Sequence, residues 1–299
     1  MRAVLLSETG GPEILRVEDV ARPDPGDGEV LIRVRAASIN PIDWKHRRGL
    51  SPKDLPAVLG SDISGTVEQS RADGFVEGED VFGFAPRGGY AEFATTPTPA
   101  IAKKPAGMTH EQAAAIPVSG LTAWQALFDR GGLQRGQTLL VAGAAGGVGH
   151  LAVQLGKHAG ARVIGTGSAR NREFVLGLGA DEFVDYTSQD VSETVSDVDL
   201  AFDTVGGETT MTLLPTVREG GALVVIAGAP PEAQAAERGV RAELLIMSVS
   251  SEQLAKIAEL VASGEVRVEI AGTFSLSQVA TAHELSEAGH TRGKLILTP

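Results

Sequence analysis

The stretch from Thr138 to Gly149 constrains the fold of this chain most strongly, because an apolar run leads directly into a turn built from glycines. The apolar run is Thr138–Ala142, and a helical pattern of apolar and small residues follows the last glycine. Strand, glycine turn and helix in this order present backbone amides at a helix N-terminus, where a pyrophosphate binds. Side chains in the turn would block the phosphates. The pattern predicts a dinucleotide-binding turn formed by Gly143, Ala144, Gly146, Gly147, Val148 and Gly149. The alternative, a tight turn that binds nothing, is disfavoured because both the strand and the helix fit.

The next strand pattern, Ala161–Thr166, indicates which nucleotide binds. An NAD-binding fold usually ends this strand with an acid, about 20 residues past the glycines, that holds the ribose hydroxyls. Here the strand is followed by Ser168, Arg170 and Arg172, with no acid at its end. Guanidinium groups bind phosphate oxygens in pairs. We therefore expect a 2′-phosphate pocket and NADP(H). In the alternative interpretation, the two arginines are solvated residues at the start of a helix.

Composition excludes several classes of function. The chain has 299 residues, no cysteine and a net charge of −12. This acidity argues against nucleic acid and anionic membranes as partners, and without cysteine there are no disulfides and no cysteine-ligated zinc. No apolar run approaches the ~20 residues of a membrane span, and the short apolar run at the N-terminus does not resemble a signal peptide. A soluble, cytoplasmic protein is expected.

The patterning changes along the chain. The first hundred or so residues read as short strands separated by proline and glycine, as in Val30–Ala36. From Thr138 strand and helix patterns alternate, which predicts a parallel sheet with right-handed crossovers. A helix is also predicted over 122–128 and a strand over 240–248, and the tail returns to β character in 267–272 and 294–298. The sequence therefore predicts an α/β protein in which the tail rejoins the first part of the chain.

Several short segments, in this order, resemble the medium-chain dehydrogenase/reductase superfamily, in particular its zinc-free quinone oxidoreductase branch. The resemblance extends over essentially the whole chain, and the segments that carry it are Asn40–Lys45, Gly60–Gly65, Gly88–Phe93, Gly120–Trp124, Ala144–Gly149 and Arg292–Lys294.

The resemblance implies a GroES-like β domain and a Rossmann domain with a doubly wound parallel sheet. The GroES-like domain is expected at 1–117 and 265–299 and the Rossmann domain at 118–264, with the active site in the cleft between them. Zinc-dependent relatives have cysteine where Asn40–Asp43 stand and Gly-His-Glu where Gly60-Ser61-Asp62 stands. With no cysteine and only 6 histidines, no metal site is expected.

The resemblance also implies roles for individual residues. Asn40 is expected near the nicotinamide ribose, and Asp43 and Lys45 on the substrate side, as the catalytic set. In the alternative interpretations, Asn40 is only a turn residue and Asp43 is a solvated acid in a loop. Thr122 is expected at the nicotinamide end of the cofactor. Tyr186 is expected at the adenosine phosphate, with an ordinary surface aromatic as the alternative. The remaining residues expected to border the cofactor are Asp203, Thr204, Val205, Gly206, Ala227 and Gly228.

The predicted reaction is hydride transfer from NADPH to a quinone or another electron-poor conjugated acceptor. Ketone reduction needs a metal or a Tyr/Lys pair to protonate an alkoxide, and neither is present here: Tyr90 and Tyr186 are followed four residues on by Ala94 and Asp190. A conjugated acceptor yields a stabilised anion, which takes its proton from water, Asp43 or Lys45. The alternatives are an NADPH-dependent enone or enal reductase and a non-catalytic NADPH-binding protein. A homodimer is expected.

Overall fold

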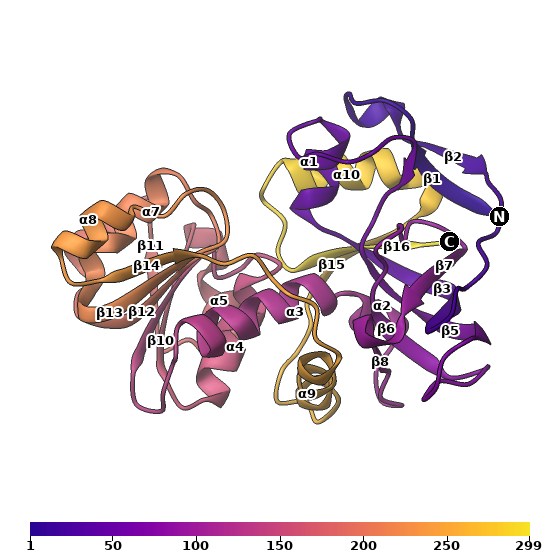
Figure 1. Ribbon diagram of the computed structural model, residues 1–299. Helices are drawn as coiled ribbons and strands as arrows, with labels where there is room; N and C mark the ends of the chain where they lie inside the picture. The colour runs from indigo at the N-terminus through magenta and orange to yellow at the C-terminus, as the bar shows by residue number, and fades with distance from the viewer. The chain divides into compact units, whose positions relative to one another are not determined.

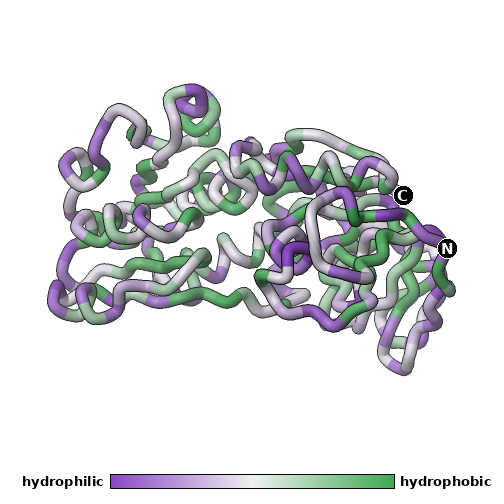
Figure 2. The backbone as a smooth tube through the Cα atoms, turned by 90° about the horizontal axis from the view of Figure 1, so that it is seen from above, coloured by the Kyte–Doolittle hydropathy of each residue, from purple (hydrophilic) through white to green (hydrophobic).

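The computed structural model describes residues 1–299, which fold into two compact units. The first, called here the β unit, comprises Met1–Leu121, Val249–Gly264 and Val268–Pro299. The second, called the nucleotide unit, comprises Thr122–Ser248 and Glu265–Arg267. Hydrophobic residues run along the strands and hydrophilic residues lie at many of the turns (Figure 2). None of the helices is long and apolar enough to cross a membrane.

The nucleotide unit is built on a six-stranded sheet in the order β11-β10-β9-β12-β13-β14 (Figure 1). All its neighbouring strands are parallel. The order reverses between β9 and β12, so the carboxyl ends of these two strands border the crevice in which doubly wound folds bind ligands. The strands are β9 (Thr138–Ala142), β10 (Arg162–Gly167), β11 (Glu182–Asp185), β12 (Val198–Asp203), β13 (Val217–Val225) and β14 (Arg241–Leu244). The helices are α4 (Gly149–His158), α5 (Arg172–Gly177), α6 (Val191–Thr194), α7 (Glu208–Leu213) and α8 (Glu232–Glu237). The predicted Rossmann fold is confirmed.

The β unit contains two sheets. A three-stranded sheet has the order β2-β1-β4, and a seven-stranded sheet has the order β15-β16-β3-β5-β6-β8, with β7 also paired to β3. The C-terminal β16 pairs antiparallel with β3, so the tail closes this unit (Figure 1, yellow against indigo). The strands are β1 (Arg2–Leu6), β2 (Arg16–Asp19), β3 (Glu29–Ile39), β4 (Ala57–Val58), β5 (Asp62–Ser70), β6 (Asp80–Phe84), β7 (Phe93–Pro97), β8 (Ile101–Lys103), β15 (Ile270–Ser275) and β16 (Lys294–Thr298).

Helices cover the strands of the β unit and begin at clear signals. Thr109 caps α2, its side chain accepting a hydrogen bond from the amide of Gln112 at 3.2 Å. Pro41 opens α1, where a missing N–H costs nothing. The helices are α1 (Pro41–Arg47), α2 (His110–Ala114), α9 (Ser251–Ala262) and α10 (Val279–Glu287). Helix α3 (Pro117–Trp124) contains the boundary between the units in the sequence, and a π-helical segment, Gln125–Arg130, belongs to the nucleotide unit.

Some elements differ from the sequence patterns. The strand predicted over 240–248 ends at Leu244, because its only neighbour β13 ends opposite it at Val225. The helix predicted over 122–128 is split between the end of α3 and the π-helical segment. Helix α10 was not predicted, although Val279, Ala282 and His283 have helical spacing and are buried.

The two units also divide the chain differently from the predicted domains. The boundary falls after Leu121 rather than after residue 117. Helix α9 belongs to the β unit, whereas the sequence placed it in the Rossmann domain. Its buried face, Leu254, Ile257 and Ala258, packs with that unit. The predicted domain limits remain a proposal about how the chain is organised for function.

Gly60 has a backbone conformation and a packing environment that only glycine satisfies. Its φ is +85°, and a Cβ atom would lie 2.2 Å from Cδ1 of the buried Tyr90 ring. Gly74 has a similar φ of +88° but nothing within 4 Å. The two positions therefore separate backbone strain from steric clash.

We expect Gly60→Ala to destabilise the protein by about 2–4 kcal/mol, of which ~1 kcal/mol is backbone strain and the rest overpacking. Gly74→Ala should lose only the ~1 kcal/mol of strain. Urea unfolding of both variants measures the difference. Equal losses would show that Tyr90 moves aside without cost.

Candidate functional site

The three spaced glycines of the nucleotide unit have different roles. Gly143 has φ +68°, and a Cβ there would lie 2.5 Å from Thr204 Oγ1. A Cβ on Gly149 would lie 2.1 Å from the carbonyl oxygen of Gly143, so this glycine lets the helix start against the strand. At Gly146 the only neighbour of an added Cβ is the Gly143 oxygen at 3.3 Å. The fold requires the outer two glycines, whereas little of the protein itself occupies the space at Gly146.

Backbone amides of this turn remain available for a ligand. Ala144 N donates to Thr166 O at 3.0 Å and Gly146 N donates to Gly143 O at 2.9 Å. The hydrogen bonds of the turn do not use the amides of Gly147 and Val148. These amides directly precede α4, a helix of 10 residues whose N-terminus carries partial positive charge. The turn can hold an anionic group such as a pyrophosphate.

The strand ends beside this turn are held by internal hydrogen bonds. Thr204 Oγ1 donates to Ala142 O at 2.7 Å, which joins the ends of β12 and β9. The buried Asp203 carboxylate accepts from Val205 N at 2.8 Å and from Gly206 N at 3.0 Å. The Val205 side chain is left 54% exposed.

Gly206 brings the end of β13 close to this edge. Its φ is +83°, and a Cβ there would lie 1.8 Å from Ala227 O. Gly228 follows with φ +97°. The structure thus brings Gly143, Thr204, Val205, Ala227 and Gly228 to one edge of the sheet, at the reversal of strand order.

The residues predicted for the adenosine end lie where β10 and β11 end. Tyr186 N donates to Gly167 O at 3.3 Å, and the Tyr186 side chain is 57% exposed. Ser168 precedes the short turn that carries the exposed Arg170. Arg172 packs instead on β11, with its guanidinium 5.8 Å from the Phe183 ring centroid. Ser168, Arg170 and Tyr186 therefore share one edge.

A second polar cluster, called here the lysine cluster, lies inside the β unit and consists of Ser38, Asn40, Asp43, Asp62, Tyr90 and Lys294, all buried. Asn40 is at its centre. Its Nδ2 donates to Asp62 Oδ2 at 2.9 Å, and its Oδ1 accepts from Lys294 Nζ at 2.5 Å. Lys294 also donates to Ile39 O at 3.0 Å. Asn40 is thus more than the turn residue that its position before Pro41 permits.

Two carboxylates complete the lysine cluster. Asp62 accepts from Ser38 Oγ at 2.9 Å and from Val118 N, in the first turn of α3, at 3.1 Å. Asp43 Oδ2 accepts from Asn40 N at 2.8 Å and from Tyr90 Oη at 2.7 Å. Asp43 is therefore a buried, hydrogen-bonded group within the β unit rather than a solvated loop acid.

Burial dominates the electrostatics of the lysine cluster. Desolvation raises the pKa of Asp62 to about 6, against the lowering effects of Lys294, Asn40 and Ser38. Desolvation also raises the pKa of Asp43 and lowers the pKa of Lys294. Burial, with the nearby charge of Asp43, raises the pKa of Tyr90 well above its usual value. Asp62 therefore holds its proton at a higher pH than a solvent-exposed aspartic acid does.

The remaining predicted residues lie outside these hydrogen-bond networks. The Lys45 ammonium lies 5.7 Å from the Trp44 ring centroid, on the partly exposed side of α1. Thr122 is buried in α3. The expectation of a cleft between two domains remains a prediction.

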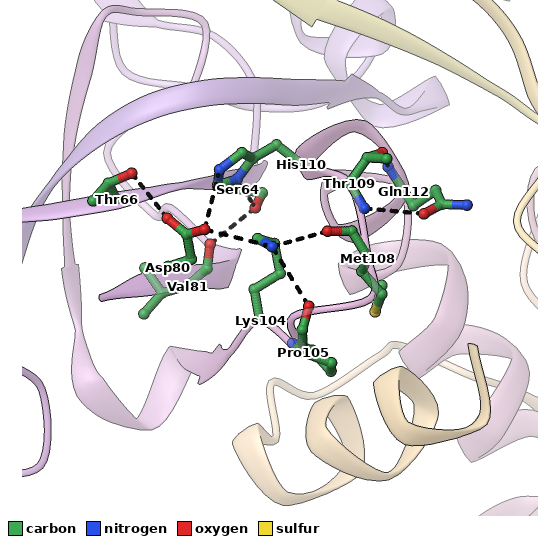
Figure 3. Close-up of polar contacts among 10 residues, drawn as sticks. All are labelled: Ser64, Thr66, Asp80, Val81, Lys104, Pro105, Met108, Thr109, His110 and Gln112. Atoms are coloured by element: carbon green, nitrogen blue, oxygen red, sulfur yellow. Dashed lines mark hydrogen bonds and ion pairs between the residues drawn. The ribbon is translucent and has the colours of Figure 1, made fainter. Parts of the chain in front are cut away.

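A serine, a histidine and an aspartate also meet in the β unit (Figure 3). Ser64 Oγ lies 2.8 Å from His110 Nδ1, and Asp80 Oδ2 lies 3.6 Å from His110 Nε2. The Ser64 hydroxyl donates to Val81 O at 2.9 Å, so its proton is not directed at His110 as the proton of a nucleophilic serine would be. Lys104 lies 3.5 Å from Asp80 on the same side. This cluster ties β5, β6 and α2 together and is not a hydrolytic site.

Two family models match the chain. The alcohol dehydrogenase GroES-like domain matches residues 26–106, and the zinc-binding dehydrogenase model matches residues 178–297. A 2-methylene-furan-3-one reductase of Solanum lycopersicum is 33% identical, over 100% of this chain and 79% of its own length. The structure of a quinone oxidoreductase from Coxiella burnetii aligns with a TM-score of 0.95 at 35% identity, covering 100% of this chain and 99% of the other.

The chain belongs to the zinc-free quinone oxidoreductase branch of the medium-chain dehydrogenase/reductase superfamily. It is an oxidoreductase that uses a nicotinamide cofactor and acts on small molecules. The structure of a mycobacterial protein complexed with NADPH aligns with a TM-score of 0.90 at 32% identity, covering 100% of both chains.

The residues of this oxidoreductase do not fit the zinc ion named by the second family model. The sequence has no cysteine, and no group of three or more histidine, cysteine, aspartate or glutamate side chains could hold a metal. In the lysine cluster the two carboxylates already accept from Tyr90, Asn40 and Ser38, beside an ammonium group. No step of the reaction is therefore assigned to zinc.

Lys294 and Asp62 were given no role by the sequence analysis, although both lie in segments that carried the family resemblance. In each case the sequence places a charged residue next to an apolar strand, which could have indicated a buried charge. Lys294 begins the apolar strand Leu295-Ile296-Leu297, and Asp62 precedes the buried Ile63. A charged residue continuous with a buried strand must find partners inside the protein.

The raised pKa of Asp62 predicts how stability depends on pH. Because the folded state binds this proton more tightly than the unfolded state, Asp62 makes the protein more stable as pH falls through about 6 towards 4. Compared with Asp62→Asn, the wild type should gain ~2 kcal/mol of unfolding free energy between pH 7 and pH 4. Urea unfolding at several pH values measures this, with Asp73→Asn at an exposed position as the control. A constant difference between wild type and Asp62→Asn would mean that Asp62 titrates normally.

Proposed function

We propose that this oxidoreductase transfers hydride from NADPH to a quinone or another electron-poor conjugated acceptor without a metal. The observation that carries the proposal is the glycine turn at the reversal of strand order. A single internal atom lies near an added Cβ at Gly146, and the amides of Gly147 and Val148 are unused. Bound there, the reduced nicotinamide supplies a hydride, and the protein supplies position and a surrounding of low polarity.

The proposed cofactor site uses the predicted residues in three groups. The turn formed by Gly143, Ala144, Gly146, Gly147, Val148 and Gly149 holds the pyrophosphate. Ser168, Arg170 and Tyr186 hold the 2′-phosphate and the adenosine ribose. Thr122, Thr204, Val205, Ala227 and Gly228 border the rest of the cofactor, and Asn40 contacts the nicotinamide ribose.

Reduction of a conjugated acceptor also requires one proton. Among the residues proposed for catalysis, Asp43 is buried and hydrogen-bonded to Tyr90, which suits it to holding the start of α1. Lys45 is partly exposed, so it or water is the proposed proton source on the substrate side. Because the product anion is delocalised, a loosely placed donor suffices.

Two further elements of the proposal concern assembly and location. A homodimer is supported by the open edge strand β14 and by Ile246, which follows it and is 80% exposed. The cytoplasmic location stays a prediction.

The second candidate function is reduction of an enone or enal double bond. It is favoured by the similarity to the tomato 2-methylene-furan-3-one reductase. Both functions use the same cofactor site and differ only in the acceptor.

The acceptor is tested by following NADPH oxidation with a panel of 1,4-quinones, 2-enals and 2-enones. Turnover that is fastest with quinones supports the main proposal, and turnover confined to enones or enals supports the second. Saturable NADPH binding without oxidation by any acceptor would instead indicate a non-catalytic NADPH-binding protein.

Gly146→Val should abolish NADPH binding while the protein still folds. Its side chain would project into the space where the pyrophosphate approaches the turn, and the only close internal neighbour is the Gly143 oxygen. Gly177→Val provides a matched control, because Gly177 is exposed and an added Cβ meets only Arg267 Nη2 at 3.8 Å. Fluorescence titration with NADPH and thermal melting of both variants measure the effect. Unchanged affinity in folded Gly146→Val would place the phosphates elsewhere.

Arg170→Ala should weaken NADPH binding by roughly ten- to a hundredfold and leave NADH nearly unchanged. Loss of one charge-assisted contact costs about 1.5–3 kcal/mol, and NADH lacks the 2′-phosphate. The effect should shrink at high salt. Arg162→Ala is the control, because Arg162 begins β10 at its opposite end and pairs with Glu182. If the wild type binds NADH as tightly as NADPH, or if Arg170→Ala weakens both, the 2′-phosphate proposal is wrong.

A further inference from the structure

The burial of the Lys294 ammonium is unusual for a strand residue, because removing a charge from water costs free energy. Its side chain is 3% exposed at the start of β16, and transferring an ammonium from water into a protein interior is costly unless partners replace the water. Its Nζ donates to Asn40 Oδ1 and to Ile39 O. No carboxylate forms a direct ion pair with it, although Asp62 and Asp43 both favour its charged form. The ammonium is therefore aimed at the end of β3 and at one side-chain amide.

The contact with Lys294 determines which way the Asn40 amide faces. An ammonium can only donate hydrogen bonds, so the amide oxygen must face Lys294. The Nδ2 group then faces Asp62, which as a carboxylate can only accept. Lysine on one side and aspartate on the other leave one orientation of the amide. In the reversed orientation the amide N–H groups would face the ammonium of Lys294, and the amide oxygen would face the carboxylate of Asp62.

The same arrangement leaves Asn40 with one unused donor. Nδ2 carries two N–H groups, and Asp62 accepts one of them. The positive charge at Oδ1 withdraws electron density from the amide, which makes the second N–H a stronger donor. Asn40 is only 2% exposed, so its surroundings screen this effect weakly.

We propose that Lys294 is a positioning residue for the nicotinamide end of the cofactor, acting through the side-chain amide of Asn40. The proposal rests on the proposed function, in which Asn40 contacts the nicotinamide ribose. Lys294 holds the amide in one orientation, and the free N–H of Nδ2 is the group offered to the ribose hydroxyls. The phosphate turn and the adenosine end are independent of Lys294.

The competing explanation is that Lys294 only balances the charges of two buried carboxylates. In that case its removal affects folding stability, and any effect on ligands follows from misfolding. The two explanations differ in which part of the cofactor loses affinity and in whether Asn40 is needed for the effect.

The test compares NADPH with adenosine 2′-phosphate 5′-diphosphate, a fragment that lacks both the nicotinamide ring and its ribose. We expect Lys294→Met to weaken NADPH binding about tenfold, the usual effect of losing one charge-assisted hydrogen bond. The fragment has no nicotinamide ribose for Asn40 to contact and should bind within about threefold of its wild-type affinity. Lys103→Met, at an exposed lysine that pairs with Glu79, is the control and should change neither affinity.

Two double variants separate positioning from charge balance. Lys294→Met combined with Asp62→Asn removes one charge of each sign, so its melting temperature should recover towards the wild-type value while NADPH affinity stays low. In an Asn40→Ala background, Lys294→Met should cause no further loss of NADPH affinity, because residues that act through one contact are not additive. If Lys294→Met alone does not fold, the charge-balanced double variant still decides between the explanations.

Several results would overturn the inference. These are equal losses for NADPH and for the fragment, unchanged binding of both, recovery of NADPH affinity in the charge-balanced double variant, or a full additional loss in the Asn40→Ala background. Failure of the proposed function is recognised separately, because the wild type would then bind neither ligand and both proposals would fall. Wild-type binding of both ligands with equal losses in the variants would reject only the role of Lys294.

Discussion

The burial of one ammonium and two carboxylates in the β unit is the constraint on which much of its architecture depends. Charged groups removed from water must be hydrogen-bonded inside the protein. The partners come from distant parts of the chain: Lys294 and Asn40 are 254 residues apart, and Tyr90 and Asp43 are 47 apart. Satisfying these groups fixes the C-terminal tail against the end of β3 and the start of α1, and the conformation of Gly60 makes room for the Tyr90 ring.

The nucleotide unit obeys a simpler constraint, the close approach of backbone segments. Gly143 and Gly149 are required by internal contacts, and Gly206 by the carbonyl of Ala227. Gly146 has no comparable internal reason to be glycine. A glycine that the fold itself does not need is best explained by something outside the fold, which is why this position carries the proposed function more strongly than its neighbours do.

The sequence predicted the nucleotide unit better than the β unit, and the reason is physical. Parallel strands buried on both faces appear as continuous apolar runs, so β9 and β10 could be located from local patterns. Strand pairing in the β unit joins segments far apart in sequence, as β16 joins β3, and no local pattern encodes those pairs. The lysine cluster was missed for the same reason. Asn40, Asp62 and Lys294 each stand in a segment that the sequence analysis quoted, but their meeting is a property of the tertiary structure alone.

The buried cation of this enzyme is a lysine ammonium and not a zinc ion, and this difference affects which acceptors the enzyme can reduce. A catalytic zinc ion keeps an open position at which a substrate oxygen can bind and its developing charge can be neutralised. The ammonium of Lys294 is almost fully buried and directs its bonds to Ile39 and Asn40, so it serves the protein rather than a substrate. Negative charge that develops on the acceptor must then be spread by the acceptor itself. Quinones and α,β-unsaturated carbonyls do this through conjugation, whereas a simple ketone would leave the charge localised on one oxygen. The donor set of this chain therefore matches the acceptors proposed for it.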